Sequence, residues 1–541
     1  MGVTGGEALR LRVERMAYGA DAIARTDDGE TVFVSGGVPG DLVDARVTQD
    51  AGTFLRARVE SVLEPSPDRV RPACPLAGAC GGCPWASLSR PLQLSSKRAS
   101  VVDSLVRIGR FDPDEAGGLV APCEAPSAPW GYRNKIELAF ARNGRRSVIG
   151  MHGTDGTSVV KVPKCPLLSG KNQALVKSVS GALTYLANSD RLSFERIGLR
   201  VSERTGDVEV ALWTRPEAFP RARAAKIVGD AVKATSVVRV MTKGASKARK
   251  IAGLEVLSGK GHWKERIGGE TMRISAPSFF QVNTTGAERL QELVLEGLSP
   301  TPDDEAMDLY CGAGTFTLPL ARRCGYVSAV ESYGPAVRDL RRNLERAGIG
   351  NADPIGGDAG LEFPDTDADV IVVDPPRAGL AADVVQKLSA QPARAIAYVS
   401  CDPATLARDL ARFRAEGAFR PLSVTPVDLF PQTFHVETVA VLSRKSASKS
   451  FIPVSISPKD MGLSEEKDQT TYANIRDYVQ KTHGMKVSSL YVAQMKAECG
   501  LETQADRSGD KKQPKCPPEK REAILDAFRH FGLIGEDETY K

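Results

Sequence analysis

Apolar and polar positions alternate in short stretches over residues 1–66. The stretches lie at residues 9–13, 20–24, 31–34, 42–47 and 54–59. Period-two alternation broken by turns, marked here by Gly19, Gly36 and Gly52, predicts five short β-strands that form a small OB-like barrel. Outward arginines on these strands fit a phosphate backbone, but on this segment alone they are better explained as the solvated faces of strands. They are Arg10, Arg12, Arg46, Arg56 and Arg58.

Residues 67–290 mix helical and strand periodicities, which predicts an α+β central domain. Apolar positions at helical spacing predict a helix over 95–108, which we expect to pack on the domain that follows. Short apolar stretches predict strands at 198–201 and 208–212. Asn283 precedes a further helical pattern, so we expect a helix to begin near Thr284.

Aromatic and basic side chains interleave between residues 130 and 138, as in Trp130, Tyr132 and Arg133. Stacking rings beside cationic groups suit the binding of single-stranded nucleic acid. An ordinary strand with a basic edge would have the same composition. From the residues alone the two interpretations are about equally good, so this stretch is a hypothetical RNA-binding surface.

Residues 291–445 alternate buried apolar runs with helical patterns. The runs lie at residues 306–310, 326–330, 370–373, 395–399 and 439–442. Strands alternating with helices predict a mostly parallel, Rossmann-like α/β sheet. Helical patterns at 472–481, 488–499 and 517–531 then predict a small helical extension of unknown role behind a linker. The predicted domains are therefore 1–66, 67–290, 291–445 and 446–541.

The composition restricts the class of protein. No apolar run among the 541 residues approaches the ~18 that a membrane span needs, and the start lacks the charged-then-apolar pattern of a signal peptide. We therefore expect a cytoplasmic, monomeric protein without membrane association. A net charge of +5 fits nucleic-acid binding without proving it. Ten cysteines in a reducing compartment indicate metal binding or catalysis rather than disulfides.

Three of the cysteines stand close together in the chain. Cys74, Cys80 and Cys83 have a C-x5-C-x2-C spacing, and Gly81 and Gly82 lie between the last two. Glycines let the backbone turn tightly, so that the three sulfurs can face one centre and receive backbone N–H groups. Three free cysteines within ten residues of a loop would be unusual. The cluster therefore predicts a metal centre.

A metal centre of this kind needs a fourth ligand. Cys165, which is followed by Pro166, is the best candidate, and Cys123 is the other. Four thiolates suit tetrahedral zinc or an iron–sulfur cluster. Zinc sites often pair two CxxC knuckles, whereas this chain offers one CxxC and two unequal partners. The spacing therefore favours a cluster, with zinc as the alternative.

Chemically active residue types also stand at the ends of the predicted strands, where ligands bind in open α/β sheets. The first strand runs into a glycine loop at 311–315, and the second ends on Glu331, an acid that can bind ribose hydroxyls. Asp358 offers a second acid near an adenine. Asp374 follows a third strand and is fixed by two prolines. The fourth strand ends at Cys401, which is a nucleophile or a small buried side chain.

The glycine loop separates two possible nucleotides. A dinucleotide fingerprint would have a third glycine where Thr317 stands, so a pyrophosphate site for NAD is disfavoured. S-adenosylmethionine carries no phosphate and does not need that glycine. The glycine loop followed by a spaced acid therefore favours S-adenosylmethionine.

These motifs are similar to those of the bacterial RNA 5-methyluridine methyltransferases, over residues 1–445. Residues 1–66 resemble the TRAM domain of RNA-modifying enzymes, and the cysteine spacing resembles the 4Fe-4S site of the members that act on 23S rRNA. Asp402 departs from the asparagine that some members have there. The catalytic motifs are Asp308-Leu-Tyr-Cys-Gly-Ala-Gly-Thr-Phe, Asp374-Pro-Pro-Arg, Ser400-Cys-Asp-Pro-Ala-Thr-Leu-Ala-Arg-Asp and Pro431-Gln-Thr-Phe-His-Val-Glu.

The resemblance implies roles for individual residues. Cys401 would be the nucleophile and Glu437 the base, with His435 orienting the base. Asp374 would contact the uracil edge or the charged end of the cofactor. The residues expected to line S-adenosylmethionine are Gln281, Tyr310, Thr315, Glu331, Asp358 and Asp374. The cluster ligands would be Cys74, Cys80, Cys83 and Cys165.

The chemistry explains why a cysteine and a base are needed together. Carbon 5 of uracil is a weak nucleophile, and a thiolate added at carbon 6 gives it carbanion character. Carbon 5 then takes the methyl group, a base removes its proton, and the cysteine is eliminated. Because the thiolate is the reactive form, we expect the pocket to lower the pKa of Cys401. A uridine inside folded RNA must also be flipped out.

We therefore expect an S-adenosylmethionine-dependent methyltransferase that forms 5-methyluridine in 23S rRNA. The same chemistry on tRNA is the alternative, and the barrel and cysteine cluster favour rRNA because tRNA members of the family usually lack both. A non-catalytic RNA-binding iron–sulfur protein is a third hypothesis. The presence of both Cys401 and Glu437 argues against it.

Overall fold

The first domain is a closed five-stranded barrel. The computed structural model describes residues 6–144, 146–244, 250–445, 472–485, 487, 489–501 and 516–535. The strand order of the barrel is β1-β2-β3-β5-β4. Neighbouring strands are antiparallel except for β3 and β5, which are parallel. Every second side chain points into a compact apolar core, as the alternation predicted. The strands are β1 (Ala8–Met16), β2 (Ala22–Arg25), β3 (Thr31–Ser35), β4 (Leu42–Asp50) and β5 (Leu55–Glu64).

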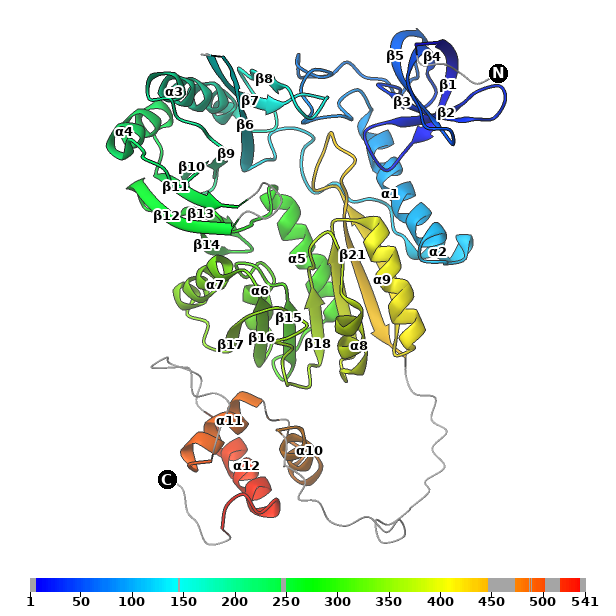
Figure 1. The fold of residues 1–541 in the computed structure, drawn as a ribbon. Helices are drawn as coiled ribbons and strands as arrows, with labels where there is room; N and C mark the ends of the chain where they lie inside the picture. Colours follow the sequence, from blue (N-terminus) through cyan, green and yellow to red (C-terminus); the bar gives the residue numbers. More distant parts are fainter. Residues whose placement is uncertain are drawn as a thin grey trace.

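A long helix, α1 (Arg90–Arg107), leads from the barrel down the side of the molecule and is followed by α2 (Pro113–Leu119) (Figure 1). It begins before residue 95, because the Ser89 side chain accepts a hydrogen bond from the Leu92 N–H and Pro91 occupies the first turn. Near its start Leu92 packs on the barrel core, while Val101 and Leu105 belong to the core of the distant α/β domain. The helix therefore ties the two domains together.

The central domain is built on a seven-stranded sheet with the order β12-β11-β10-β9-β6-β7-β8. Helices α3 (Leu175–Ser189) and α4 (Arg221–Val232) cover one face and share an apolar core with it. A short 3-10 helix, η1 (Gly170–Ala174), precedes α3, and a separate hairpin follows the sheet. The strands of the sheet and hairpin are β6 (Lys135–Asn143), β7 (Arg146–His152), β8 (Val159–Val160), β9 (Arg196–Val201), β10 (Val208–Thr214), β11 (Ser236–Lys243), β12 (Lys250–Gly259), β13 (Trp263–Ile267) and β14 (Glu270–Ile274).

The α/β domain has a seven-stranded sheet with the order β17-β16-β15-β18-β19-β21-β20. Its first five strands are parallel, and the last two are antiparallel to their neighbours. The strands are β15 (Glu305–Leu309), β16 (Tyr326–Glu331), β17 (Ala352–Gly356), β18 (Val370–Val373), β19 (Ala395–Ser400), β20 (Phe419–Val427) and β21 (Glu437–Arg444). The helices are α5 (Thr284–Leu298), α6 (Thr317–Ala321), α7 (Gly334–Ala347), α8 (Ala382–Ala390) and α9 (Pro403–Glu416).

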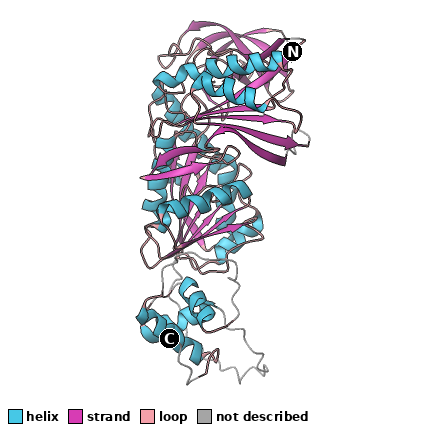
Figure 2. Ribbon diagram, turned by 90° about the vertical axis from the view of Figure 1, so that its left-hand side faces the viewer, coloured by secondary structure: helices cyan, strands magenta, loops and turns pink. Residues whose placement is uncertain are grey.

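Helices cover both faces of this sheet (Figures 1 and 2). Successive residues of β18 show how: Val370 and Val372 join the core under α5, α6 and α7, and Ile371 and Val373 join the core under α8, α9 and α1. A strand buried on both faces reads as a continuous apolar run, which is why the runs predicted buried parallel strands. The predicted Rossmann-like α/β class is confirmed.

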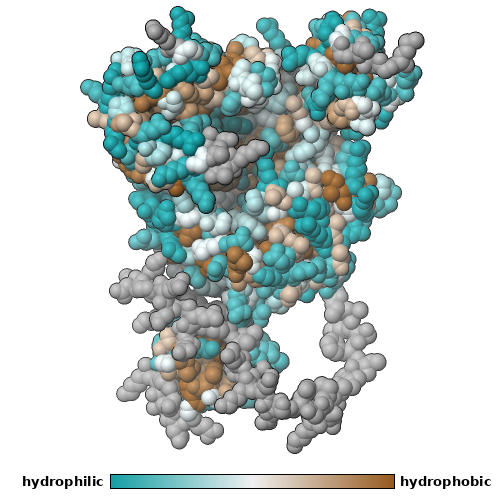
Figure 3. All heavy atoms as spheres, viewed as in Figure 1, coloured by the Kyte–Doolittle hydropathy of each residue, from teal (hydrophilic) through white to brown (hydrophobic). Residues whose placement is uncertain are grey.

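Three helices form the C-terminal extension: α10 (Tyr472–His483), α11 (Ser489–Glu498) and α12 (Pro518–His530). They share a small apolar core of their own. Arg476 Nη1 lies 3.2 Å from Glu305 Oε2, an ion pair with the α/β domain at the start of β15. In the view of Figure 3 the surface is mostly hydrophilic, with a hydrophobic area over these helices. The linker predicted from residue 446 lies outside the described residues.

Among the described helices, none is long and apolar enough to cross a membrane. Helices of the α/β domain bury one apolar stripe and leave the opposite face polar. In α7, for example, Leu340 and Leu344 are buried while Arg341, Arg342 and Glu345 are exposed.

Candidate active site

The strand register brings Cys401 and Glu437 together. In the antiparallel pair of β19 and β21, Val399 is opposite Val439 and Ser400 is opposite Thr438. The next residues in this register are Cys401, which follows β19, and Glu437, the first residue of β21. Cys401 is half-buried and Glu437 is buried. A thiol and a carboxyl group far apart in the sequence therefore lie side by side at one edge of the sheet.

The charges around Cys401 oppose its ionisation. Burial and the neighbouring Glu437 raise the pKa of the Cys401 thiol to about 11, and Arg377 acts in the opposite direction. The expectation of a lowered pKa is therefore wrong. Two further carboxyl groups, Asp374 and Asp402, also disfavour the thiolate, so the pocket holds more acids than bases. In this pocket the thiol is the resting form.

Two carboxyl groups of the pocket, those of Glu437 and Asp374, have pKa values raised to about 7 or well above their usual range. Burial raises the pKa of Glu437 well above its usual range, with a further contribution from Asp374. Burial also raises the pKa of Asp374 to about 7. A carboxyl group with a raised pKa is a stronger proton acceptor once it is ionised, which suits a general base. These raised pKa values therefore favour transfer of a proton from Cys401 to the carboxyl groups of the pocket once those are ionised.

Arg377 is a site residue to which no role was assigned from the sequence. It follows the Asp-Pro-Pro corner at the end of β18, and its charge favours ionisation of both Cys401 and Glu437. Burial, together with the Arg377 charge, lowers the pKa of His435 to about 4, so His435 is neutral at neutral pH. The sequence feature that could have pointed to Arg377 is its position directly after the rigid Asp-Pro-Pro motif at the end of β18.

Asp402, the residue that departs from some relatives, has a structural role. Its side chain accepts hydrogen bonds from the N–H groups of Ala404 and Thr405, at 3.0 Å each, and so caps the first turn of α9. Pro403 occupies the first position of that helix. Asparagine caps a helix equally well, which explains why either residue is compatible with this turn. The cap fixes the backbone immediately after Cys401.

The expected cofactor residues follow the parallel strands at the same edge of the sheet. Tyr310 directly follows β15 and has a left-handed φ of 65°, and the chain then turns into the glycine loop. The Gly312 N–H donates to Glu331 Oε2 at 3.0 Å, which links that loop to the end of β16. Asp358 follows β17 and accepts from the Gly360 N–H at 2.9 Å. Their order along the edge is that of an extended ligand lying across the strands.

Two details of this edge fit a ligand. A side-chain atom added at Gly312 would meet open space, so this part of the loop is not packed against other protein atoms. Gln281 is buried, yet its Oε1 has no hydrogen-bond partner among the described residues. A buried, unpaired amide oxygen is costly unless a ligand supplies a donor. Thr315 lies in the same loop, and its carbonyl accepts from Gln291 Nε2 at 2.6 Å.

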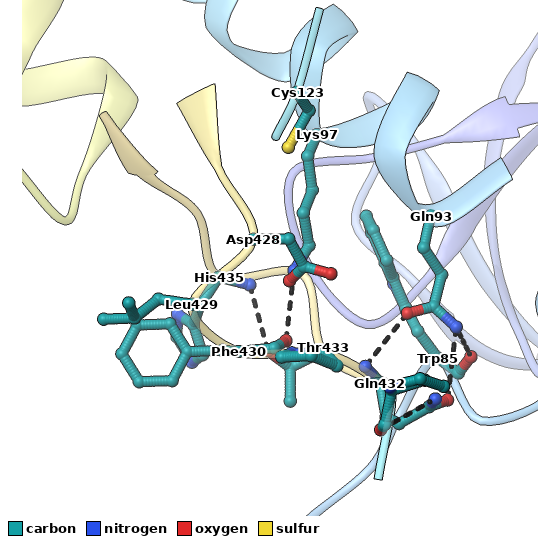
Figure 4. A network of polar contacts seen from close by, with 12 residues as sticks. Trp85, Gln93, Lys97, Cys123, Asp428, Leu429, Phe430, Gln432, Thr433 and His435 are labelled. Atoms are coloured by element: carbon teal, nitrogen blue, oxygen red, sulfur yellow. Dashed lines mark hydrogen bonds and ion pairs between the residues drawn. The ribbon is translucent and has the colours of Figure 1, made fainter. Parts of the chain in front are cut away.

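The loop before Glu437 is fixed by α1, as Figure 4 shows. Lys97 Nζ pairs with Asp428, and both side chains are fully buried. The same ammonium group donates to the Phe430 carbonyl at 3.0 Å. Gln432, which has a left-handed φ of 69°, is held by the buried Gln93. No local sequence pattern indicates this network, because its partners are more than 300 positions apart.

The aromatic and basic stretch near residue 132 also contacts this loop. The Tyr132 hydroxyl donates to the Pro431 carbonyl at 3.0 Å, and the Arg133 guanidinium lies 5.9 Å from the Tyr132 ring centroid. Both side chains are thus engaged within the protein. Most of the barrel arginines are engaged as well: Arg10, Arg12, Arg46 and Arg56 form exposed ion pairs with acids of the barrel. Such pairs are weak and exchange easily with other anions.

The four expected cluster cysteines line one small cavity. Cys74, Cys80, Cys83 and Cys165 all border it, together with apolar side chains such as Met151 and Leu167. Cys123 lies elsewhere, and the charges that act on its thiol are those of Lys97, Arg90 and Glu124. No group of three or more Cys, His, Asp or Glu side chains in the described ranges is arranged to hold one metal ion. None of these four cysteines forms a disulfide.

Comparison with known proteins gives the class of enzyme. The family described as tRNA (Uracil-5-)-methyltransferase matches residues 262–356 and 358–445, and the TRAM domain matches residues 2–59. An RNA methyltransferase of Gloeobacter violaceus, described as uncharacterized, is 35% identical over 456 residues, which is 81% of this chain and 97% of the relative. One of Streptomyces avermitilis, described in the same way, is 34% identical over 81% of this chain and 98% of its own.

A solved structure agrees with this assignment. The Pyrococcus abyssi tRNA (uracil-54, C5)-methyltransferase in complex with S-adenosyl-L-homocysteine superposes with a TM-score of 0.63, at 26% identity over 80% of this chain and 99% of that one. The chain belongs to the RNA (uracil-5-)-methyltransferase family, with a TRAM domain at its N-terminus. It is an S-adenosylmethionine-dependent enzyme that methylates carbon 5 of uridine in RNA.

Proposed function

We propose that this enzyme methylates a uridine of 23S rRNA through a covalent bond between Cys401 and carbon 6 of the base. The observation that carries the mechanism is the register of β19 and β21, which supports a nucleophile and a base acting on the same ring from adjacent strands. Arg377 and Asp374 stand beside them. In this proposal residues 1–66 and 67–290 bind the RNA, and residues 291–445 catalyse the methyl transfer.

The chain's own groups account for each proton and bond. Cys401 loses its proton to the Asp374 carboxylate, which leaves Glu437 to act as the later base. The Cys401 Sγ bonds to carbon 6 while the carbon 5–carbon 6 π pair moves toward the ring carbonyl. Bound S-adenosylmethionine supplies the electrophilic methyl group to carbon 5. Glu437 then removes the proton from carbon 5, the ring double bond re-forms, and the Cys401 sulfur leaves carbon 6. The raised pKa of Glu437 suits this last step.

The cofactor would lie along the carboxyl edge of the parallel strands. Gln281, with its unpaired Oε1, is suited to a donor on the ligand. Glu331 would hold the ribose hydroxyls, and Asp358 the adenine amino group. Tyr310 and Thr315 would border the same ligand from the glycine loop. The Asp374 carboxyl group acts electrostatically on both Cys401 and Glu437, so it would face the reacting end of the cofactor.

The four cysteines of the cavity would hold a 4Fe-4S cluster. A cubane keeps its thiolate ligands farther apart than the single tetrahedral zinc ion does. The cavity that all four cysteines border supports one shared centre, and their unequal spacing in the chain favours a cluster over zinc. Gly81, whose N–H donates to the His152 carbonyl at 2.9 Å, anchors the cysteine loop to the central sheet. The cluster would act structurally, since the methyl transfer needs no electron.

The RNA substrate has two candidates. The barrel together with the cysteine cavity supports 23S rRNA. The Pyrococcus abyssi tRNA (uracil-54, C5)-methyltransferase supports tRNA as the second candidate because its match covers 80% of this chain. Incubation with labelled S-adenosylmethionine and either 23S rRNA or total tRNA separates them. We expect label in rRNA; label confined to tRNA would replace the proposed substrate, and methylation by Cys401→Ala at the wild-type rate would refute the covalent mechanism.

A further inference from the structure

One residue of the barrel stands at the catalytic centre. Tyr18 lies in the turn between β1 and β2, and its ring packs edge-on against Phe434, with 5.8 Å between the centroids. Phe434 precedes Glu437 by three residues and also packs against the barrel core. The ring of His435 lies 4.2 Å from that of Phe434. A barrel side chain thus touches the loop that leads to the catalytic base.

The turn that carries Tyr18 is fixed rather than free. Trp85, which is fully buried, donates from Nε1 to the Gly19 carbonyl at 3.0 Å. The backbone N–H of the same residue donates to the Gln432 carbonyl at 3.0 Å. One tryptophan therefore ties the turn and the catalytic loop to each other. Tyr18 nevertheless remains 38% exposed, so part of its ring faces open space.

The surroundings of the Tyr18 hydroxyl are those of the reaction centre. The charged or ionisable groups that act on it are Asp402, Cys401, Arg377 and Glu437, and none belongs to the barrel. Burial and the nearby acids raise its pKa, so the hydroxyl keeps its proton and remains a donor at any working pH. A pocket with an excess of carboxyl groups offers few such neutral donors.

We propose that Tyr18 is a substrate-binding residue of the methyl-transfer site and that its hydroxyl donates a hydrogen bond to oxygen 4 of the target uracil. This inference rests on the proposed covalent function. When the Cys401 sulfur bonds to carbon 6, negative charge develops on oxygen 4, and a fixed donor there stabilises the transition state more than the ground state. The proton stays on Tyr18 throughout. The barrel then completes the active site in addition to holding RNA.

The test uses the full chain and 23S rRNA transcribed with uridine or with 5-fluorouridine. Fluorine on carbon 5 cannot leave as a proton, so the covalent adduct accumulates and is counted on a denaturing gel. Tyr18→Phe keeps the ring and removes only the hydroxyl, while Tyr18→Ala removes both. Tyr185, an exposed tyrosine on α3, provides the control Tyr185→Phe.

For Tyr18→Phe at saturating RNA we expect adduct formation and methyl transfer to fall about 10²-fold, the loss typical of removing one oxyanion donor. RNA affinity should stay within about two-fold of wild type, because the ring is retained. Tyr185→Phe should match wild type in both. A wild-type rate for Tyr18→Phe, or a loss confined to RNA affinity, would overturn the role of Tyr18. If the wild-type enzyme itself forms no adduct and no 5-methyluridine, the proposed function fails instead.

Discussion

Gln93 and Gln432 hydrogen-bond each other in both directions. Gln93 Nε2 donates to Gln432 Oε1 at 3.1 Å, and the Gln432 backbone N–H donates to Gln93 Oε1 at 2.9 Å. Both residues are buried, and Gln432 has a left-handed φ that costs a non-glycine residue of order 1–3 kcal/mol. Helix α1 therefore holds a strained point of the loop that ends at Glu437.

Replacing Gln93 by Ala should loosen this loop. The substitution leaves the N–H and the side-chain oxygen of Gln432 without these partners, and we expect a loss of about 1–3 kcal/mol in the free energy of unfolding. Urea unfolding measures that loss, and single-turnover methylation should slow because Glu437 is less well positioned. Gln480→Ala, at an exposed position of α10, is the control and should change neither quantity. Unchanged turnover in Gln93→Ala would show that the loop keeps its shape without α1.

Replacing Glu437 by Gln should stop the reaction after methyl transfer. Without a base the proton on carbon 5 stays, so Cys401 cannot be eliminated and the enzyme remains bonded to methylated RNA. We expect turnover to fall about 10²- to 10⁴-fold, the usual contribution of a general base. A denaturing gel with labelled RNA should show the adduct in Glu437→Gln and none in the double variant with Cys401→Ala. Glu345→Gln, on the exposed face of α7, should turn over normally.

The stability of the enzyme should fall as the pH rises toward 8, partly through Asp308. Burial raises the pKa of Asp308 to about 8, above the ~3.9 of an aspartate in an unfolded chain. The folded state therefore binds this proton more tightly, and the advantage is lost as the pH rises from ~4 through 8. Asp308→Asn cannot ionise and still accepts the hydrogen bond from the Thr317 hydroxyl.

Urea midpoints at pH 5 and pH 8.5 test this linkage. Asp308→Asn should gain stability relative to wild type at pH 8.5, with a smaller difference at pH 5. Asp303→Asn, at an exposed position just before β15, should track wild type at both. A difference that grows at acid pH would mean that Asp308 is held as a carboxylate in the folded state.

Iron content should depend on Cys165 and be independent of Cys123. The first thiol borders the cavity shared with Cys74, Cys80 and Cys83, and the second does not. After anaerobic purification we expect iron and sulfide in wild type and in Cys123→Ser, and at least a several-fold loss in Cys165→Ser. Zinc in place of iron in the wild-type protein would refute the cluster, and equal loss from both variants would refute this choice of ligand.

The motifs at Asp374 and Cys401 could be predicted locally because each is a strand end followed by a fixed turn. Cys401 is followed by a helix cap and a proline, and Asp374 by two prolines, so the backbone around both is set by near neighbours in the chain. The ionisation of Cys401 could not be predicted in this way. Its neighbours Glu437 and Arg377 come from other strands, and the balance of their charges with burial decides the direction of the pKa.

The sequence by itself determined the barrel, the α/β class and the strand-end residues, because hydrophobic periodicity and turn chemistry act over a few residues. Only the tertiary structure decided which of those residues meet. It placed Glu437 beside Cys401 through the register of β19 and β21, and it held that loop through Gln93 of α1. It also brought Tyr18 of the barrel to Phe434, in the loop before Glu437. The first of these contacts depends on strand register and the other two on how separate domains pack, and no local pattern encodes either.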